Sequence, residues 1–141
     1  MLEYRADGKR VREWGRAGTG PGQFHLPHSI VIDEDGIVYV ADRENGRIQR
    51  FDLDGKYVGE FANLGRVYSL KLSGGALWAG MQPLNEPAGA PGWLLKMDRK
   101  TGKILGYVEV KDKGGLHSVE VSAIGEPITT LRDHVEWFRA P

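Results

Sequence analysis

The 141-residue chain contains no cysteine, so it offers neither a disulfide framework nor an indication of redox compartment. No apolar run approaches the roughly 20 residues of a membrane-spanning helix, and residues 1–5 lack a secretory pattern. An excess of one charge is also missing, because 19 Lys and Arg residues balance 19 Asp and Glu residues. The composition therefore predicts no membrane and no nucleic-acid partner, and it leaves the localisation unknown.

A sustained helical period is absent as well, whereas the 20 glycines fall at turns between short apolar, β-branched and aromatic runs. Three of these turns are equivalent, because Gly8, Gly55 and Gly102 each precede a lysine and lie 47 residues apart in both steps. A constant period of this kind indicates a repeat architecture. A β-sandwich also has many short strands, but it would lack the constant period.

Each of these turns joins a hairpin, and another strand pair precedes the second and third hairpins and follows the last. The unit is therefore four antiparallel strands, the blade of a β-propeller. We predict an all-β fold, a partial β-propeller of about three four-stranded blades from a presumed six-bladed ring. Residues 1–141 form a single partial propeller in this interpretation. Its predicted parts are two strands of a blade at 1–15, blades at 22–62 and 64–110, and an incomplete blade at 115–141. The open strand edges make self-association possible.

Candidate site residues follow from the repeat. The first residues of an innermost strand lie at the rim of the central channel, and here they are His28, Tyr68 and His117. Alternate blades of a six-bladed ring are a third of a turn apart, so one more histidine would complete a three-histidine zinc site. The loop at 42–46 opens on the same face and directs Arg43 to the channel mouth, where a guanidinium suits a carboxylate.

Simpler interpretations of these residues remain open. A histidine at a strand start is usually a surface residue, and Tyr68 can merely fill the channel. Arg43 can pair with a neighbouring carboxylate, Asp42 or Glu44. His25 stands three residues before the first rim histidine, but on an extended segment the two rings need not converge.

The segments 22–29 and 40–49 resemble NHL-repeat propellers, in particular the lyases that cleave peptidyl-α-hydroxyglycine in peptide C-terminal amidation. The run Ala-Asp-Arg-Glu-Asn-Gly-Arg-Ile-Gln at 41–49 is close to diagnostic of that group, and the run at 114–120 is similar to its bacterial relatives. The resemblance covers essentially the whole chain and corresponds to the C-terminal part of the family's six-bladed ring.

The resemblance implies zinc-dependent cleavage of the N–C bond in a peptide or small-molecule substrate, which gives an amide and glyoxylate. His28 and His117 match zinc ligands of the family, and Arg43 matches an active-site arginine. The family's third zinc ligand, catalytic tyrosine and second arginine correspond to positions upstream of Met1, so we expect the isolated chain to be inactive. Ser118 stands where the family has an aspartate associated with structural calcium, which makes calcium doubtful.

The alternative is a non-catalytic NHL-repeat module that presents one face to a protein or to RNA. The neutral net charge weakens the RNA version, because phosphate contacts dominate nucleic-acid affinity. The metal content of the purified full-length parent protein would separate the two classes of function.

Overall fold

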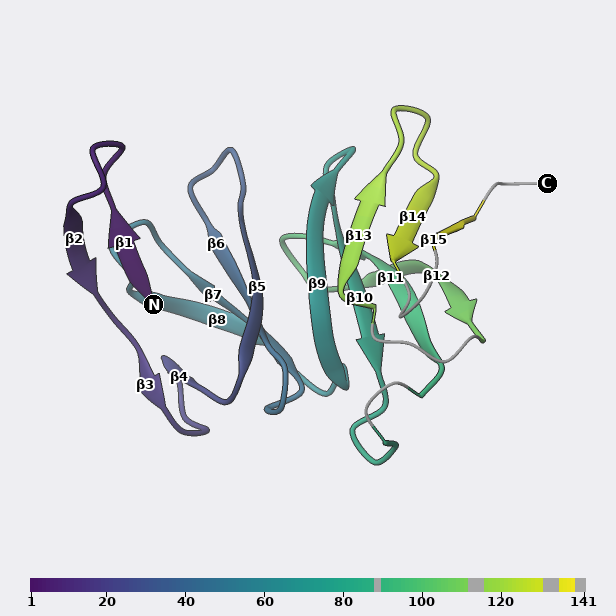
Figure 1. Cartoon of the computed structure of the whole chain (residues 1–141), viewed down its shortest axis with the longest axis horizontal. Helices are drawn as coiled ribbons and strands as arrows, with labels where there is room; N and C mark the ends of the chain where they lie inside the picture. Colours follow the sequence, from purple (N-terminus) through teal and green to yellow (C-terminus); the bar gives the residue numbers. More distant parts are fainter. Residues whose placement is uncertain (88–89, 112–115, 131–134, 139–141) are drawn as a thin grey trace.

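The computed structural model describes residues 1–87, 90–111, 116–130 and 135–138, and these residues form β-strands and turns (Figure 1). The strands are β1 Leu2–Tyr4, β2 Arg10–Glu13, β3 Arg16–Ala17, β4 Gln23–Phe24, β5 Pro27–Ile32, β6 Val38–Asp42, β7 Arg47–Phe51, β8 Tyr57–Phe61, β9 Arg66–Ser73, β10 Ala76–Gln82, β11 Gly92–Asp98, β12 Ile104–Val110, β13 Ser118–Val121, β14 Pro127–Thr130 and β15 Val135–Trp137. None of the described residues belongs to a helix long and apolar enough to cross a bilayer.

The strands are grouped into sheets in which chain order is also spatial order. β5–β8 and β9–β12 are four-stranded antiparallel sheets, β13–β15 is three-stranded, and β1–β2 is a hairpin. Figure 1 shows these sheets following one another from the purple N-terminal hairpin to the yellow C-terminal strands. The first strands of successive sheets, β5, β9 and β13, lie next to each other. The chain is therefore all-β and has the architecture of a partial propeller, with consecutive blades and inner strands side by side.

The repeated turns have the conformation that the sequence predicts. Gly8, Gly55 and Gly102 all have φ of 76–81°, the left-handed region that favours glycine. Each donates its N–H to a carbonyl oxygen at the start of its turn, at 2.8–3.0 Å. The third turn is one residue longer, because the acceptor for Gly102 is Asp98, four residues back rather than three. Because strand direction alternates, these turns lie at the sheet end opposite the start of β5.

The apolar core lies between the blades. β6 and β10 are buried along their whole length, because each is an interior strand of a sheet that is covered on both faces. The largest cluster joins the two complete sheets and includes Tyr39, Ile48, Phe61, Val67, Leu77 and Met97. A second joins β9–β12 to β13–β15 through Trp78, Leu94, Val110, Leu116 and Val119. A third contains Phe24, Val38, Val40 and Phe51, with Trp14 against it. Each repeat thus buries its apolar faces on its neighbours.

Two features lie outside the blade pattern. β3 and β4 form a short parallel pair between the first hairpin and the first complete sheet, and the sequence pattern did not predict it. On the open side of β5, Ile30 and Ile32 are 46% and 55% exposed, and they line a hollow of about 460 Å³ together with Leu2 and Tyr4. Self-association through the open strand edges at the two ends of the chain remains a prediction.

Candidate functional site

Two of the predicted rim residues stand at β-bulges, at the same place in successive repeats. In β5, Pro27 faces Asp42 and Ser29 faces Ala41, so the ladder with β6 skips His28. In β9, the ladder with β10 skips Tyr68 in the same way, between Val67 and Ser69. A bulge adds a residue to one strand and re-aims its side chain, and bulges are frequent beside active sites.

Serines that follow the rim residues join the inner strands of neighbouring blades. The hydroxyl oxygen of Ser29 accepts a hydrogen bond from the N–H of Leu70 at 3.1 Å. The hydroxyl of Ser69 donates to the carbonyl of Leu116 at 2.7 Å, which fixes the residue directly before His117. The inner strands β5, β9 and β13 belong to different sheets and share no backbone ladder. The two serine hydrogen bonds therefore help to fix how these strands are positioned along one another.

The three rim side chains form one cluster. The ring centroids of His28 and His117 are 5.5 Å apart, and their distances to the Tyr68 ring are 5.5 and 5.1 Å. Both histidines are exposed, whereas Tyr68 is only 2% exposed. Among the residues that the structure describes, the buried Tyr68 hydroxyl has no hydrogen-bond partner.

Arg43 joins this cluster from the loop between β6 and β7. The central carbon of its guanidinium lies 5.0 Å from the centroid of the Tyr68 ring. Its Nε and Nη2 also contact Oε1 of Glu44, at 2.8 and 2.7 Å. Arg43 therefore pairs with Glu44 and also lies at the rim cluster, and its role at a site stays a prediction.

Glu44 and Arg66 are parts of the cluster that sequence reasoning did not assign. Nε of Arg66 lies 3.1 Å from Oε2 of Glu44, so one carboxylate holds two guanidinium groups, those of Arg66 and Arg43. Burial of Glu44 opposes its ionisation, but hydrogen bonds from both arginines and their charges outweigh this and lower the pKa of its carboxyl. The only sequence signal was the neighbour relation of residues 43 and 44, since Arg66 comes from β9.

The rest of the run 41–49 is structural. Asp42 is fully buried, and its carboxylate accepts four hydrogen bonds, from the side chains of Asn45, Arg47 and Gln49 and the backbone N–H of His25, at 2.7–2.9 Å. Arg47 and Gln49 also donate to backbone carbonyls in the segment 20–23 before β5. The Asp42 network therefore anchors the segment that leads into β5. The side chains of Arg43 and Glu44 take no part in this network and lie at the rim cluster instead.

The electrostatic surroundings favour a neutral imidazole at His28. Partial burial of the ring, followed by the positive charge of Arg43 and the influence of His117, lowers the pKa of His28, and Glu44 opposes this shift. The neutral imidazole is the form that binds metal ions.

The two histidines fit part of a zinc site. Two imidazoles bound to one zinc at tetrahedral angles, with Zn–N bonds of about 2 Å, would have ring centres roughly 5 Å apart. The observed 5.5 Å between His28 and His117 is close to this separation. Among the described residues, no group of three His, Cys, Asp or Glu side chains is placed to hold a metal. The cluster therefore supplies two imidazoles, those of His28 and His117, whereas the hydrogen bond of His25 to Asp42 comes from its backbone N–H.

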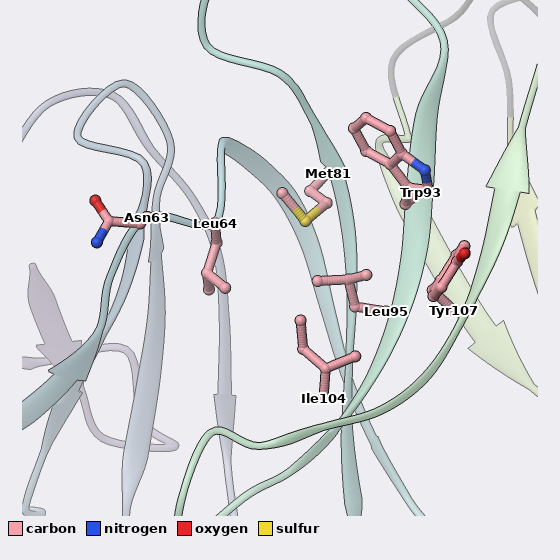
Figure 2. A pocket seen from close by; sticks show the side chains of 7 residues that line it. All are labelled: Asn63, Leu64, Met81, Trp93, Leu95, Ile104 and Tyr107. Carbon is pink, nitrogen blue, oxygen red and sulfur yellow. The ribbon is translucent and has the colours of Figure 1, made fainter.

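A separate hollow of about 250 Å³ lies on the side of the second complete sheet (Figure 2). Its lining is mostly apolar, with Leu64, Met81, Leu95 and Ile104 beside Trp93, Tyr107 and the amide of Asn63. It shares no residue with the rim cluster, and it lacks the charged groups that the rim cluster gathers.

Comparisons with known proteins agree with the repeat. The family model of the NHL repeat matches residues 24–51, which include β5, β6 and β7. The chain is 52% identical to the human NHL repeat-containing protein 3 over 50 residues, 35% of this chain and 14% of that protein. It is 40% identical to the peptidylglycine alpha-amidating monooxygenase of Rattus norvegicus over 88 residues, 56% of this chain and 9% of that protein. The chain thus matches only a small part of the length of these relatives.

Solved structures show the same fold at low sequence identity. A putative exported protein from Bacteroides fragilis aligns with 98% of this chain and 41% of its own, with a TM-score of 0.65 and 16% identity. Hydrazine synthase from Kuenenia stuttgartiensis aligns with 79% of this chain and 33% of its own, with a TM-score of 0.63 and 16% identity. Likeness at this identity concerns the fold alone, and these neighbours are propellers. The chain therefore has the fold of a partial β-propeller, matches the NHL repeat at residues 24–51, and is similar over part of its length to amidating monooxygenases and NHL-repeat proteins.

Proposed function

We propose that this chain carries part of the zinc site of a lyase-like propeller that cleaves peptidyl-α-hydroxyglycine to a peptide amide and glyoxylate. The observation that carries the proposal is the meeting of His28 and His117, 5.5 Å apart, beside the guanidinium of Arg43. The similarity to the amidating monooxygenase of Rattus norvegicus over 88 residues supports it.

The reaction divides one substrate molecule in two. The bond between the amide nitrogen and the hydroxyl-bearing carbon breaks, the nitrogen gains a proton, and the hydroxyl proton leaves as the aldehyde of glyoxylate forms. His28 and His117 would hold the metal, and zinc, when bound, supplies a Lewis acid for the hydroxyl oxygen. Arg43 would orient the substrate carboxylate, a role that its held position beside Glu44 suits.

The proposal assigns the base and a further metal ligand to residues outside 1–141. We therefore expect weak zinc binding and no turnover from the 141-residue chain alone, because two imidazoles leave the coordination of zinc incomplete. Zinc binding is the direct readout for the residues that this chain supplies.

The experiment is a titration with zinc in which binding is measured by isothermal titration calorimetry, and His28→Ala and His117→Ala are the test variants. Each variant should lower the affinity for zinc by at least tenfold. His25→Ala is the matched control, because His25 is an exposed histidine three residues from His28 whose contact to Asp42 uses only its backbone. Zinc affinity that is equal in all four proteins would contradict the proposed site.

An activity assay completes the test. Release of glyoxylate from a peptidyl-α-hydroxyglycine is followed with and without added zinc. No turnover is expected from the 141-residue chain, and turnover by this chain that survives in His28→Ala and His117→Ala would contradict the proposed roles of both histidines. Absence of zinc binding would favour the alternative function, a non-catalytic binding module, to which the likeness to NHL repeat-containing protein 3 also applies.

A further inference from the structure

The hydroxyl of Tyr68 is the polar group at the rim whose bonding is incomplete. The residue is 2% exposed, and among the described residues no partner accepts or donates a hydrogen bond at this oxygen. A buried hydroxyl without a partner costs free energy, and such groups in native structures call for an explanation, such as an ion or a ligand. The question is which group this hydroxyl would bind.

The backbone holds Tyr68 in this position. It is the bulged residue of β9, between Val67 and Ser69, which both pair with β10. Ser69 is tied to Leu116 in the next blade by a 2.7 Å hydrogen bond. The tyrosine therefore cannot relieve its unpaired hydroxyl by a shift of the strand without breaking these contacts.

The surroundings of Tyr68 favour an anionic partner. The guanidinium of Arg43 lies 5.0 Å from the centroid of its ring, and that of Arg66 bonds to the same carboxylate as Arg43. Two positive groups thus share the single negative charge of Glu44. Such an excess of positive charge at a half-buried site attracts carboxylates, and a phenolic hydroxyl beside it is a suitable second donor.

We propose that the Tyr68 hydroxyl donates a hydrogen bond to a carboxylate oxygen of a small α-hydroxy acid unit bound beside His28 and His117, with Arg43 as the counter-charge. The choice of ligand class rests on the proposed function, because peptidyl-α-hydroxyglycine carries a hydroxyl and a carboxylate on one carbon. His28 and His117 are exposed residues whose rings lie 5.5 and 5.1 Å from the Tyr68 ring, so a ligand bound at the histidines lies beside this tyrosine. Tyr68 is then a substrate-binding residue that discriminates carboxylates.

The test uses glycolate as the probe, which is an α-hydroxy acid with no peptide part. Glycolate is titrated into the wild-type chain, Tyr68→Phe and Tyr107→Phe, with and without zinc chloride, and binding is followed by NMR. We expect Tyr68→Phe to weaken glycolate binding about tenfold, the value of one hydrogen bond to a charged group. Zinc affinity should not change in this variant. Tyr107→Phe is the control, because it removes the hydroxyl of a tyrosine that is 68% exposed on β12.

The outcomes separate this inference from the proposed lyase function. Equal glycolate affinity in wild type and Tyr68→Phe would overturn the inference, and so would a wild-type chain that does not bind glycolate in either condition. Glycolate binding that depends on Tyr68 in a protein that binds no zinc would uphold the inference and contradict the zinc site. A thermal unfolding midpoint of Tyr68→Phe at or above that of wild type confirms that the variant is folded.

Discussion

Two buried tyrosines that differ in their hydrogen bonding lie beside the two ends of β5, Tyr39 on β6 and Tyr68 on β9. Tyr39 and Tyr68 are both 2% exposed and both stand on strands that border this region. At the far end of β5, the Tyr39 hydroxyl donates to the carboxylate of Asp33 at 2.9 Å and also lies 3.1 Å from the carbonyl oxygen of Arg99. At the rim end, the Tyr68 hydroxyl has no partner among the described residues.

The Asp33 end joins two blades. Asp33 directly follows β5, and its carboxylate accepts from the backbone N–H groups of Asp35 and Ile37 at 3.0 and 2.8 Å. Arg99, which follows β11 in the next sheet, donates to the same carboxylate at 2.6 Å. Each of these groups is bonded to another, so the cluster stabilises the contact between the blades.

The comparison teaches that burial and residue type do not separate structural from ligand-binding polar groups. Completeness of bonding does, because an unsatisfied buried donor is destabilising unless a ligand completes it. The Asp42 network belongs to the complete kind, although it lies at the same end as the rim cluster. Mutations in the fully hydrogen-bonded clusters around Asp33 and Asp42 should therefore change stability. Mutation of Tyr68, whose hydroxyl has no described partner, should change ligand binding.

The largest expected effect is at Asp42. Asp42→Ala would leave Arg47, which is 6% exposed, without its buried carboxylate, and we expect a loss of about 3–5 kcal/mol in unfolding free energy, the usual cost of breaking a buried ion pair. Urea denaturation measures this. The control is Glu60→Gln, at the more exposed end of the same arginine, for which a loss under about 1 kcal/mol is expected. Similar losses in the two variants would contradict the central place of Asp42.

The two tyrosines should respond in opposite directions. Tyr39→Phe removes a hydrogen bond to a charged carboxylate and should lower the unfolding free energy by about 1.5–3 kcal/mol. Tyr68→Phe removes a hydroxyl that has no described partner, so the ligand-free protein should be unchanged or more stable by up to about 1 kcal/mol. Parallel urea titrations of both variants test the contrast. A loss in Tyr68→Phe that equals the loss in Tyr39→Phe would mean that the Tyr68 hydroxyl is bonded in solution.

Much of the fold follows from the sequence because repetition supplies an internal comparison. The 47-residue step between Gly55 and Gly102 predicted equivalent turns, and both glycines have the same positive φ. The repeat also brought His28, Tyr68 and His117 into one group as the first residues of successive inner strands, and the structure places their rings within 5.1–5.5 Å of one another. Their role as a site stays a prediction.

The partners in the site could not be predicted, because they come from different repeats or depend on local register. Arg66 reaches Glu44 from the next sheet, and no spacing in the sequence relates the two. The bulges at His28 and Tyr68 are also invisible in a pattern of apolar alternation, although they decide where these side chains point. The parallel pair β3–β4 was missed for a similar reason, since it consists of two residues on each side.

Gly80 links the rim to the packing between blades. An added Cβ at Gly80 would lie 2.6 Å from the hydroxyl of Ser69 and 2.9 Å from Leu116, directly before His117. Gly80→Ala should therefore cost about 1–3 kcal/mol by overpacking and should also weaken zinc binding through the displaced His117. Gly106→Ala, on β12 with nothing within 4 Å of its added Cβ, is the control and should be close to neutral. If Gly80→Ala is as stable as wild type and binds zinc equally well, the hydrogen bond between Ser69 and Leu116 does not determine the position of His117.

The smallest effect that we expect is a pH dependence of the unfolding free energy that comes from Asp33, which directly follows β5. Burial alone would raise the pKa of Asp33, but hydrogen bonds from Ile37, Tyr39 and Arg99 and the charge of Arg99 outweigh it and lower this pKa below its usual 3.8. A carboxyl with a lowered folded-state pKa stabilises the protein above pH 3.8, and this contribution is lost as the pH falls through the folded-state value.

Wild type should therefore exceed Asp33→Asn in unfolding free energy at pH 7, and the difference should shrink below about pH 4. Urea unfolding of both proteins between pH 7 and pH 2.5 measures the difference. Glu34 and Asp35, the other carboxylates at Arg99, are present in both proteins, so their own titration contributes equally to first order. A difference in unfolding free energy that stays constant over this range would show that the charge of Asp33 does not contribute to stability. Asp33 would then stabilise the contact between the blades through its shape and through hydrogen bonds that do not depend on ionisation.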